Sequence, residues 1–412
     1  MILSQSNHLS AKNCMETIRK PRLALRSTNR ISTASLLLLL LPAPVEAQFD
    51  YTTNDGAIII MRYTGAGGPV IIPSEIDGLP VKDIEGFCGG TSATDITVPD
   101  SVTNIGRNAF AYCCSLTNVT LGSGVATIGE DAFFYYAPCA SLITITVDPS
   151  NLFFGSVDGV LFNRSQTTLI MYPKGRAGNY TVPGGVTAIG PGAFQQCDKL
   201  TSVTLPNGIT NIGDNAFANA GELGQSILTN ISLPDTITTI GNYAFFGLNS
   251  HIGRFQGFEG STVTTLIIPG TVSSIGDFSF EFISLTAIFF LGNAPKLGDQ
   301  GWLYHFDQYS NAPVVYHLPG TTGWGAIYGG LPTMLWNPQI QTTAPNFGVR
   351  TNQFGFAISG SSNLAVVVEA STKLDNTIWL PVSTNILTGG SSYFNDPNWI
   401  NYPSRFYRLR PL

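Results

Sequence analysis

Charged residues are scarce in this sequence, because only 11% of its 412 residues are Asp, Glu, Lys or Arg, against about 25% in an ordinary soluble domain. Helical proteins usually carry surfaces rich in charge, so this scarcity argues against a helix-dominated fold. The chain contains 44 Gly and 25 Pro instead. Together with abundant Thr, Ser and Asn, this composition fits many short strands joined by turns. A hydrophobic fraction of 43% argues against general disorder.

Cysteine and histidine are also rare. Six Cys are too few for a scaffold built on disulfides. The four His form no H-E-x-x-H pair, and no nucleophile elbow, phosphate-binding loop or dinucleotide fingerprint is present. We therefore expect no catalytic residues, no metal site and no cofactor, and we predict that the protein is not an enzyme.

Residues 1–47 are predicted to be a secretory signal peptide. A basic stretch precedes the apolar run Leu36–Leu41, and the small residues Val45 and Ala47 suit cleavage after residue 47. The run is too short to span a bilayer as a helix. Whether translation begins at the first methionine or at Met15 stays open at this point.

Removal of the signal peptide leaves a more acidic product. Residues 1–47 contain six Lys/Arg and two Asp/Glu, so the net charge changes from −6 to −10. Such a chain lacks the basic surface that nucleic acids and anionic lipids require, and we exclude both as partners. We expect a protein secreted or held at the cell surface, without a transmembrane helix in the mature chain, and monomeric.

An internal repeat is the strongest signal in the chain. One sequence motif recurs along the chain: Val, Leu or Ile followed by Pro, then an apolar residue, then an Ile-Gly pair. Most copies are followed by Ala-Phe, and several of these by Cys. The Ile-Gly pairs fall at 105–106, 128–129, 189–190, 212–213, 240–241 and 275–276. Ile105 and Ile128 are 23 residues apart, as are Ile189 and Ile212, and the later copies are longer. This many matches in register indicates stacked units of one kind.

Each unit predicts one strand and a set of turns. In 116–121, Val119 and Leu121 alternate with Asn118 and Thr120, a period of two that is typical of a half-buried strand. One unit cannot bury its apolar face alone, so successive units must stack into one continuous core. The strands of neighbouring units then pair in parallel, about 4.8 Å apart.

The repeat resembles the BspA-like leucine-rich repeats of bacterial secreted and surface proteins, by the pattern L-x-x-V-x-L-P-x-x-V-x-x-I-G-x-x-A-F-x-x-C. The resemblance runs from about Ile71 to Leu291 and implies a β-rich solenoid: a parallel strand ladder with irregular or short-helical turns on the other side. It departs from the pattern near Phe87, where a unit is short. It departs again at 278–280, where Phe-Ser-Phe replaces Ala-Phe, so we expect distorted rungs there.

The chain divides into six predicted parts. They are a signal peptide (1–47), an N-terminal cap with a first irregular repeat (48–95), the repeats (96–291, with an insert near 148–172), a closing segment (292–338), a linker (339–345) and a small C-terminal β-sandwich-like domain (346–412). The ending, Ser404 to Arg410, resembles a C-terminal module found behind such repeats in exported bacterial proteins. The resemblance leaves open whether that module binds, anchors or only caps.

The outward strand positions are the candidate binding site. If Val119 and Leu121 point inward, the equivalent outward positions of successive units form an almost uncharged ladder of short polar side chains that could bind glycans or an extended peptide. Its members are Asp95, Thr97, Asn118, Thr120, Thr144, Thr146, Ser202, Thr204, Asn230, Ser232 and Thr265. The alternative is that β-branched polar residues merely suit exposed strands.

Three other features of the sequence involve residues that can carry chemistry. Cys113 and Cys139 occupy the same slot of neighbouring units, where a disulfide is conceivable, but we favour buried thiols. His305, in the closing segment, is interpreted as a loop residue. Carboxylates that follow Ile-Gly, at Glu130, Asp131, Asp214 and Asp277, are interpreted as a solvated edge rather than a catalytic pair.

Three functions follow, in order of preference. The first is a non-catalytic repeat protein that binds a protein or polysaccharide partner at the cell surface. The second is a structural envelope or matrix protein without a discrete ligand. The third is a carbohydrate-active enzyme or carbohydrate-binding module in the C-terminal domain.

Overall fold

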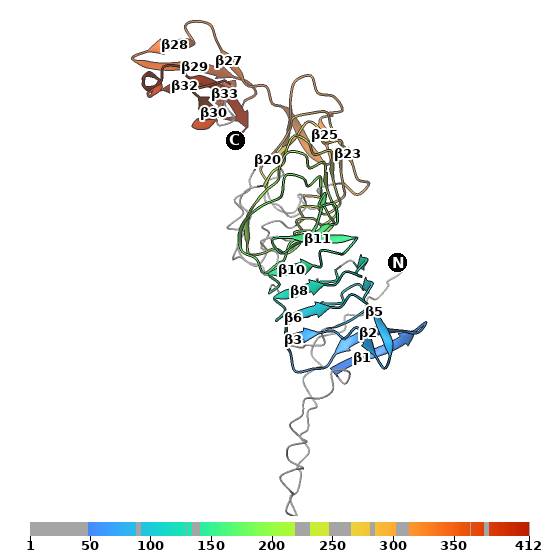
Figure 1. Ribbon diagram of the computed structural model, residues 1–412. Helices are drawn as coiled ribbons and strands as arrows, with labels where there is room; N and C mark the ends of the chain where they lie inside the picture. The colour runs from blue at the N-terminus through green and yellow to red at the C-terminus, as the bar shows by residue number, and fades with distance from the viewer. Residues whose placement is uncertain are drawn as a thin grey trace, which may run out of the picture. The chain divides into compact units, whose positions relative to one another are not determined.

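The computed structural model describes residues 48–411 except 88–91, 130, 134–140, 219–230, 247–264, 281–284, 302–312, 363 and 375–378. The predicted signal peptide therefore lies outside the described residues. Within them the chain forms a β-solenoid followed by a small all-β unit (Figure 1). The described solenoid turns contain no α-helix. The predicted fold class is confirmed.

The first ladder contains the strand that the repeat pattern predicts, once in each unit. These strands pair in parallel, as expected. They are β3 (Gly68–Ile71), β6 (Ala93–Val98), β8 (Asn118–Leu121), β10 (Thr144–Val147), β14 (Gly178–Thr181), β16 (Leu200–Thr204), β18 (Ile231–Ser232), β20 (Thr265–Ile268), β22 (Ala287–Phe290), β24 (Val314–His317) and β26 (Leu331–Leu335).

A second parallel ladder, which the sequence analysis did not predict, runs through the Ile of each Ile-Gly pair. Most of its strands are only two residues long, and they belong to two separate sheets, one before the insert and one that begins with it. Within each sheet the isoleucines of successive Ile-Gly pairs are in register. They are β2 (Ala57–Tyr63), β5 (Leu79–Ile84), β7 (Asn104–Ile105), β9 (Thr127–Ile128), β13 (Thr168–Met171), β15 (Ala188–Ile189), β17 (Asn211–Ile212), β19 (Thr239–Ile240), β21 (Ser274–Ile275) and β23 (Lys296–Leu297).

The two ends of the solenoid carry antiparallel pairs. At the N-terminal end, β1 (Phe49–Asn54) pairs with β2, and β4 (Glu75–Ile76) pairs with β5. At the C-terminal end, β25 (Ile327–Tyr328) pairs with β26. The indole of Trp324 stacks there on the ring of His317, at a centroid distance of 5.1 Å, and packs at a tilt against the ring of Phe290, at 5.0 Å. These pairs cover the terminal rungs, which have a stacking neighbour on one side only.

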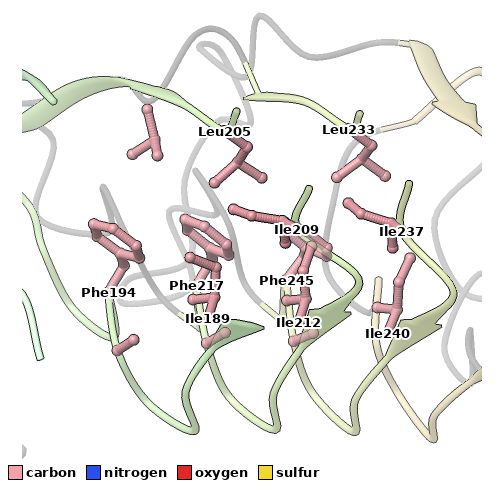
Figure 2. Packing of buried hydrophobic residues seen from close by; sticks show 14 of the residues in the cluster. Ile189, Phe194, Leu205, Ile209, Ile212, Phe217, Leu233, Ile237, Ile240 and Phe245 are labelled. Carbon is pink, nitrogen blue, oxygen red and sulfur yellow. The ribbon is translucent and has the colours of Figure 1, made fainter. Parts of the chain in front are cut away.

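The core consists of columns of identical side chains, one from each rung (Figure 2). The rings of Phe194, Phe217, Phe245 and Phe280 stack at centroid distances of 4.9, 5.2 and 5.3 Å. This interval follows from the strand spacing of about 4.8 Å. A column of isoleucines from the second ladder runs beside the rings.

The irregular repeat at 278–280 keeps its place in these columns. Phe280 is 1% exposed and takes the position of the repeat phenylalanine, and Ser279 takes that of the alanine. The Ser279 hydroxyl lies within hydrogen-bond distance of the carbonyls of Gly241 and Gly276, at 2.8 and 2.6 Å, and its single hydrogen can donate to either. The distortion expected of this rung is therefore absent from the core column, because a hydroxyl with two acceptors can replace a buried methyl group.

The glycine of most Ile-Gly pairs lies too close to the backbone of the preceding rung to carry a side chain. A Cβ on Gly213 would lie 2.7 Å from the backbone nitrogen of Pro191 and 2.9 Å from the carbonyl carbon of Gly190, both in the preceding rung. These neighbours are backbone atoms, which cannot turn aside as a side chain can.

Replacing Gly213 by alanine is expected to lower the free energy of unfolding by about 1–3 kcal/mol, as overpacking does. Gly185→Ala is the matched control, because a Cβ there would meet nothing within 4 Å. Urea unfolding of the two variants measures the difference. Equal urea midpoints for the two variants would show that neighbouring rungs can move apart to accommodate a Cβ at Gly213 without loss of stability.

The insert divides the core, which corrects the expectation of one continuous interior. Strands β11 (Phe154–Val157) and β12 (Val160–Asn163) form a hairpin, and β12 continues antiparallel to β13. Leu161 packs in the core of the N-terminal half, whereas Val160 and Phe162 pack in the core of the C-terminal half. All three are 0% exposed. Alternate side chains of one strand thus face two separate hydrophobic clusters.

The insert is fixed to the preceding rung by Asn151, which is 0% exposed. Its amide nitrogen donates to the carbonyls of Gly122 and Val125, at 3.0 and 2.9 Å. Its side-chain oxygen accepts from the backbone nitrogens of Phe153 and Phe154, both at 2.8 Å. One buried side chain therefore satisfies four backbone groups that no strand pairs.

The C-terminal unit consists of two antiparallel sheets around a small core. One sheet contains β27 (Gln339–Gln341), β28 (Phe347–Arg350), β29 (Gln353–Ser359) and β32 (Ser391–Asp396). The other has β30 (Ala365–Ser371) at its centre, between β31 (Leu380–Ile386) and β33 (Phe406–Pro411). The 3-10 turns Thr388–Gly390 and Trp399–Asn401 flank β32 in the chain.

Candidate functional site

Two rows of polar side chains lie on the outward face of β6, β8 and β10. Register places Asp95, Asn118 and Thr144 in one row. The second row contains Thr97, Thr120 and Thr146, all of which are exposed. Between the rows the inward residues, such as Val119, are buried. The structure thus brings six of the predicted residues together on one face.

Hydrogen bonds order part of this face. The Asn118 amide donates to the Asp95 carboxylate at 2.7 Å, and the Thr94 hydroxyl donates to the other carboxylate oxygen, also at 2.7 Å. The bonds from Thr94 and then Asn118 lower the pKa of Asp95 below its ordinary value, because both favour the ionised form. Asp95 therefore acts as a fixed acceptor on the surface.

A second polar block lies on β14 and β16. Ser202 and Thr204 are in register with Asn179 and Thr181 of the preceding strand. The Thr201 hydroxyl donates to the Asn179 amide oxygen at 2.6 Å, so this block also forms hydrogen bonds from rung to rung. Ser232 follows in register on β18, whereas Asn230 lies outside the described residues.

The face does not stay polar beyond β20. Thr265 is in register with Ala287 and then Val314. The neighbouring row passes through Phe289 and Tyr316, whose rings stack at a centroid distance of 4.7 Å. The described first-ladder strands also belong to three separate sheets. Thr265 therefore lies at the margin of an apolar region, apart from the polar block on β6, β8 and β10.

The second ladder carries a groove that the sequence analysis missed. Its volume is about 500 Å³, and it crosses several rungs at the Ile-Gly turns. The side chains at its polar positions are Asn211, Thr239, Ser274 and Lys296, which share one register. The sequence pattern that predicts this polar row is present in the repeat, because a polar residue precedes each of these Ile or Leu residues.

The carboxylates after Ile-Gly have a structural role. Asp214 accepts from the backbone nitrogen of Asn242 at 2.7 Å, and Asp277 accepts from that of Gln300 at 2.8 Å. Asn242 itself accepts from the backbone nitrogen of Asp277 at 2.8 Å. These side chains connect one rung to the next. Asp131 instead forms an exposed ion pair with Arg107, at 3.4 Å.

The prediction of a buried free thiol at Cys113 is wrong, because Cys113 and its neighbour Cys114 are both disulfide-bonded. Equivalent slots of stacked rungs lie close enough for such bonds. Cys139 lies outside the described residues. Cys197 does have a free, buried thiol, and burial raises its pKa to about 12. That thiol stays protonated and unreactive at neutral pH.

No metal site is found among the residues that the structure describes. Across the described ranges, no three His, Cys, Asp or Glu side chains are grouped so that they could hold a metal ion. His305 lies outside those ranges, and His317 stacks on Trp324. No helix among the described residues has the length and apolar character needed to cross a membrane.

Comparison with protein-family models identifies the repeat. The model described as the BspA-type leucine-rich repeat region matches six copies, over residues 83–175, 170–251 and 251–302. Together these matches span residues 83–302, which is more than half of the chain. No curated protein matches the sequence.

Several solved bacterial structures are similar. The pneumococcal vaccine antigen PcpA is 19% identical, with a TM-score of 0.42, 70% of this chain covered and 92% of PcpA covered. A leucine-rich cell surface protein from Faecalibacterium prausnitzii is 20% identical, with a TM-score of 0.32 and coverages of 59% and 86%. The leucine-rich repeat protein of T. pallidum is 23% identical, with a TM-score of 0.25 and coverages of 71% and 90%.

Proposed function

This chain belongs to the BspA-type leucine-rich repeat family, and from that premise we propose that it is a secreted or surface-associated protein that binds a protein or polysaccharide partner without catalysing a reaction. The first strand ladder is the binding face. The observation that carries the proposal is the pair of aligned polar rows on β6, β8 and β10. Solenoids commonly use such extended faces for binding.

The chemistry of the rows fits a partner with many hydrogen-bonding groups and little charge. Thr97, Thr120 and Thr146 present one hydroxyl per rung, and each hydroxyl both donates and accepts. The amide of Asn118 is held by the Asp95 carboxylate. Because the backbone and part of the side-chain network are already ordered, binding loses less conformational entropy than it would on a flexible loop.

The test is a screen of the mature chain against glycan and protein arrays, followed by a triple substitution. Changing Thr97, Thr120 and Thr146 to glutamate places three like charges about 4.8 Å apart along the row. We expect affinity for the array partner to fall by tenfold or more, because each substitution removes a hydroxyl donor and adds a charge that must be desolvated against a partner of little charge.

A matched triple substitution on the second ladder is the control. Thr127, Thr187 and Thr239 are also polar residues at or next to its strands, and their change to glutamate adds the same net charge. This control is expected to keep affinity within about twofold. Equal losses in both variants would contradict the assigned face. Blank arrays would favour a structural envelope or matrix role instead.

A further inference from the structure

The residue three positions after each repeat isoleucine has a left-handed backbone conformation. Its φ lies between 54° and 62° in all six copies, which are Asn108, Asp131, Gly192, Asn215, Tyr243 and Phe278. The stacking of the rungs sets this conformation, because the backbone nitrogens of Asn215, Tyr243 and Phe278 each donate to a carbonyl of the next rung. Gly, Asn and Asp suit such a backbone. A bulky Tyr or Phe is strained there.

The two aromatic residues at this position form a stack outside the core. The rings of Tyr243 and Phe278 lie 5.1 Å apart between centroids, and Tyr243 meets the ring of Phe246 edge-on at 5.5 Å. None of the three rings belongs to the core cluster of this half of the solenoid, and Tyr243 is 36% exposed. Exposed rings thus stand on a strained backbone where earlier rungs have Asn, Asp or Gly. Strain of this kind is concentrated at functional sites.

The groove of the second ladder passes beside this stack. Asn242, which directly precedes Tyr243 in the chain, lines the groove. The isoleucine of each Ile-Gly pair points inward, so the glycines face outward and give the groove a floor without side chains. The polar row along it, Asn211, Thr239, Ser274 and Lys296, crosses three intervals between rungs, or about 14 Å. That length suits a polymer rather than a single sugar.

The groove and the stack together offer the two kinds of contact that a sugar ring can make. The Thr239 hydroxyl donates to the amide oxygen of Asn211, which leaves the two amide hydrogens of Asn211 for a ligand. The Ser274 hydroxyl both donates and accepts. The C–H groups on the face of a sugar can pack on an aromatic ring, whose face is negative. A proline-rich peptide also packs on aromatic rings, but proline has no N–H group to donate to this row.

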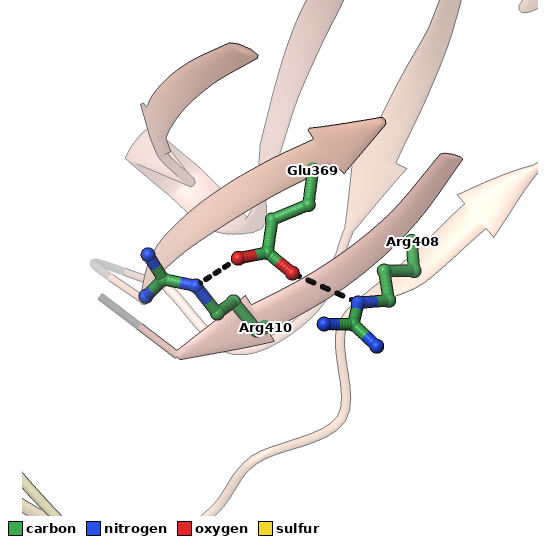
Figure 3. Close-up of polar contacts among 3 residues, drawn as sticks. All are labelled: Glu369, Arg408 and Arg410. Atoms are coloured by element: carbon green, nitrogen blue, oxygen red, sulfur yellow. Dashed lines mark hydrogen bonds and ion pairs between the residues drawn. The ribbon is translucent and has the colours of Figure 1, made fainter. Parts of the chain in front are cut away.

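The charge of the chain favours a neutral polymer over an anionic one. Residues 48–345 contain nine Lys/Arg and 21 Asp/Glu, a formal charge of −12, and Asp214 lines the groove. In the C-terminal unit, Nε of Arg408 and Nε of Arg410 both donate to the buried carboxylate of Glu369, at 2.8 and 2.5 Å (Figure 3). These two arginines thus belong to an internal ion-pair cluster. A polyanion is repelled by the acidic solenoid, whereas a neutral, hydroxyl-rich polymer is not.

We propose that the groove of the second ladder and the ring of Tyr243 form a binding site for a neutral polysaccharide. One sugar ring stacks on Tyr243, and neighbouring hydroxyl groups bond to Asn211, Thr239 and Ser274. The strain at Tyr243 is then explained by the need for an aromatic ring beside the groove. The site is separate from the polar rows of the first ladder and does not depend on the function proposed for them.

The experiment measures retention of the full mature chain in native gels that contain a soluble polymer. Mixed-linkage β-glucan, galactomannan and soluble starch are the neutral probes. Polygalacturonate tests the anionic alternative, and poly-L-proline tests the peptide alternative. We expect retention by at least one neutral polysaccharide that salt changes little, because no ion pair is formed, and no retention by the other two polymers.

Replacing Tyr243 by asparagine separates a binding role from a structural one. Asparagine occupies this position at Asn108 and Asn215 and suits a positive φ, so the urea midpoint is expected to stay the same or to rise. Affinity for the retained polymer is expected to fall about tenfold, because the aromatic face is lost. Tyr243→Phe keeps that face and is expected to bind within about twofold of the unchanged protein.

Tyr393→Asn is the matched control, because Tyr393 is an exposed tyrosine on β32 of the C-terminal unit. It is expected to bind the polymer as the unchanged protein does. The proposal is overturned if no neutral polysaccharide is retained, if Tyr243→Asn binds as tightly as the unchanged protein, or if that variant lowers the urea midpoint. An equal loss in Tyr393→Asn, or retention by poly-L-proline alone, would also overturn it.

Discussion

Replacing Phe217 by alanine is expected to lower the free energy of unfolding by about 3–5 kcal/mol, the range for large buried aromatic residues. The ring is 0% exposed. It is stacked between Phe194 and Phe245, with interplanar angles of 4° and 2°. Its loss removes both ring contacts and leaves a cavity that the flanking strands cannot close, because their spacing is fixed by the backbone ladders.

Phe153→Ala is the control for this prediction. Its ring is 51% exposed, so its removal is expected to change the free energy of unfolding by no more than about 0.5 kcal/mol. Chemical denaturation followed by circular dichroism measures both variants. An equal effect at the two positions would contradict the assignment of Phe217 to the core column.

Replacing Asn151 by alanine is expected to be nearly as costly. The substitution removes four hydrogen bonds and leaves the Val125 carbonyl and the N–H groups of Phe153 and Phe154 without their partner, whereas the Gly122 carbonyl keeps a bond from the backbone nitrogen of Val125. At about 1 kcal/mol for each group left without a partner, the loss is about 3 kcal/mol. The effect should be concentrated at the insert, so hydrogen exchange of residues 151–163 should become faster than that of the distant rungs.

Leu152→Ala is the neighbouring control, because that side chain is 75% exposed. It should change neither the unfolding midpoint nor the exchange of the insert. If Asn151→Ala leaves exchange at the insert unchanged, then the hydrogen bonds of Asn151 do not hold the hairpin to the preceding rung.

The solenoid could be predicted from the sequence because its information is local and repeated. The alternation of Val119 and Leu121 with polar residues gives the strand, and its recurrence gives the stacking direction. The phenylalanine that follows Ile-Gly then falls into one column without any long-range argument. Phe280 is buried in the same column although its repeat reads Phe-Ser-Phe instead of Ala-Phe. The position within the repeat, and not the exact motif, therefore decides which ring is buried.

Features that depend on one unrepeated contact could not be predicted. The division of the core at Val160, Leu161 and Phe162 arises because both faces of one hairpin strand are covered, and an apolar run alone does not distinguish this from a one-sided strand. The disulfide at Cys113 depends on which residue lies opposite its sulfur. The same repeat position can accommodate either a buried free thiol or a disulfide-bonded cysteine.

The candidate site was predicted only in part. The register of Thr97, Thr120 and Thr146 follows from the period of two, and the structure brings these residues together. The change from polar to apolar residues on this face at Phe289 and Tyr316 was not predicted, because β22 and β24 depart from the alternation of apolar and polar residues in the earlier repeats. The ion pairs of Glu369 join residues 39 and 41 positions apart, a separation at which sequence patterns carry no pairing information.

The central claim is that equivalent polar positions of successive repeats form one row on one face. Paired cysteine substitutions test it directly. Residues 97 and 120 are expected to lie about 4.8 Å apart between Cα atoms, within disulfide range, whereas residues 97 and 146 are about 9.6 Å apart. After mild oxidation and peptide mass mapping, T97C/T120C should be cross-linked and T97C/T146C should not. Cross-linking of the second pair alone, or of both equally, would contradict the row.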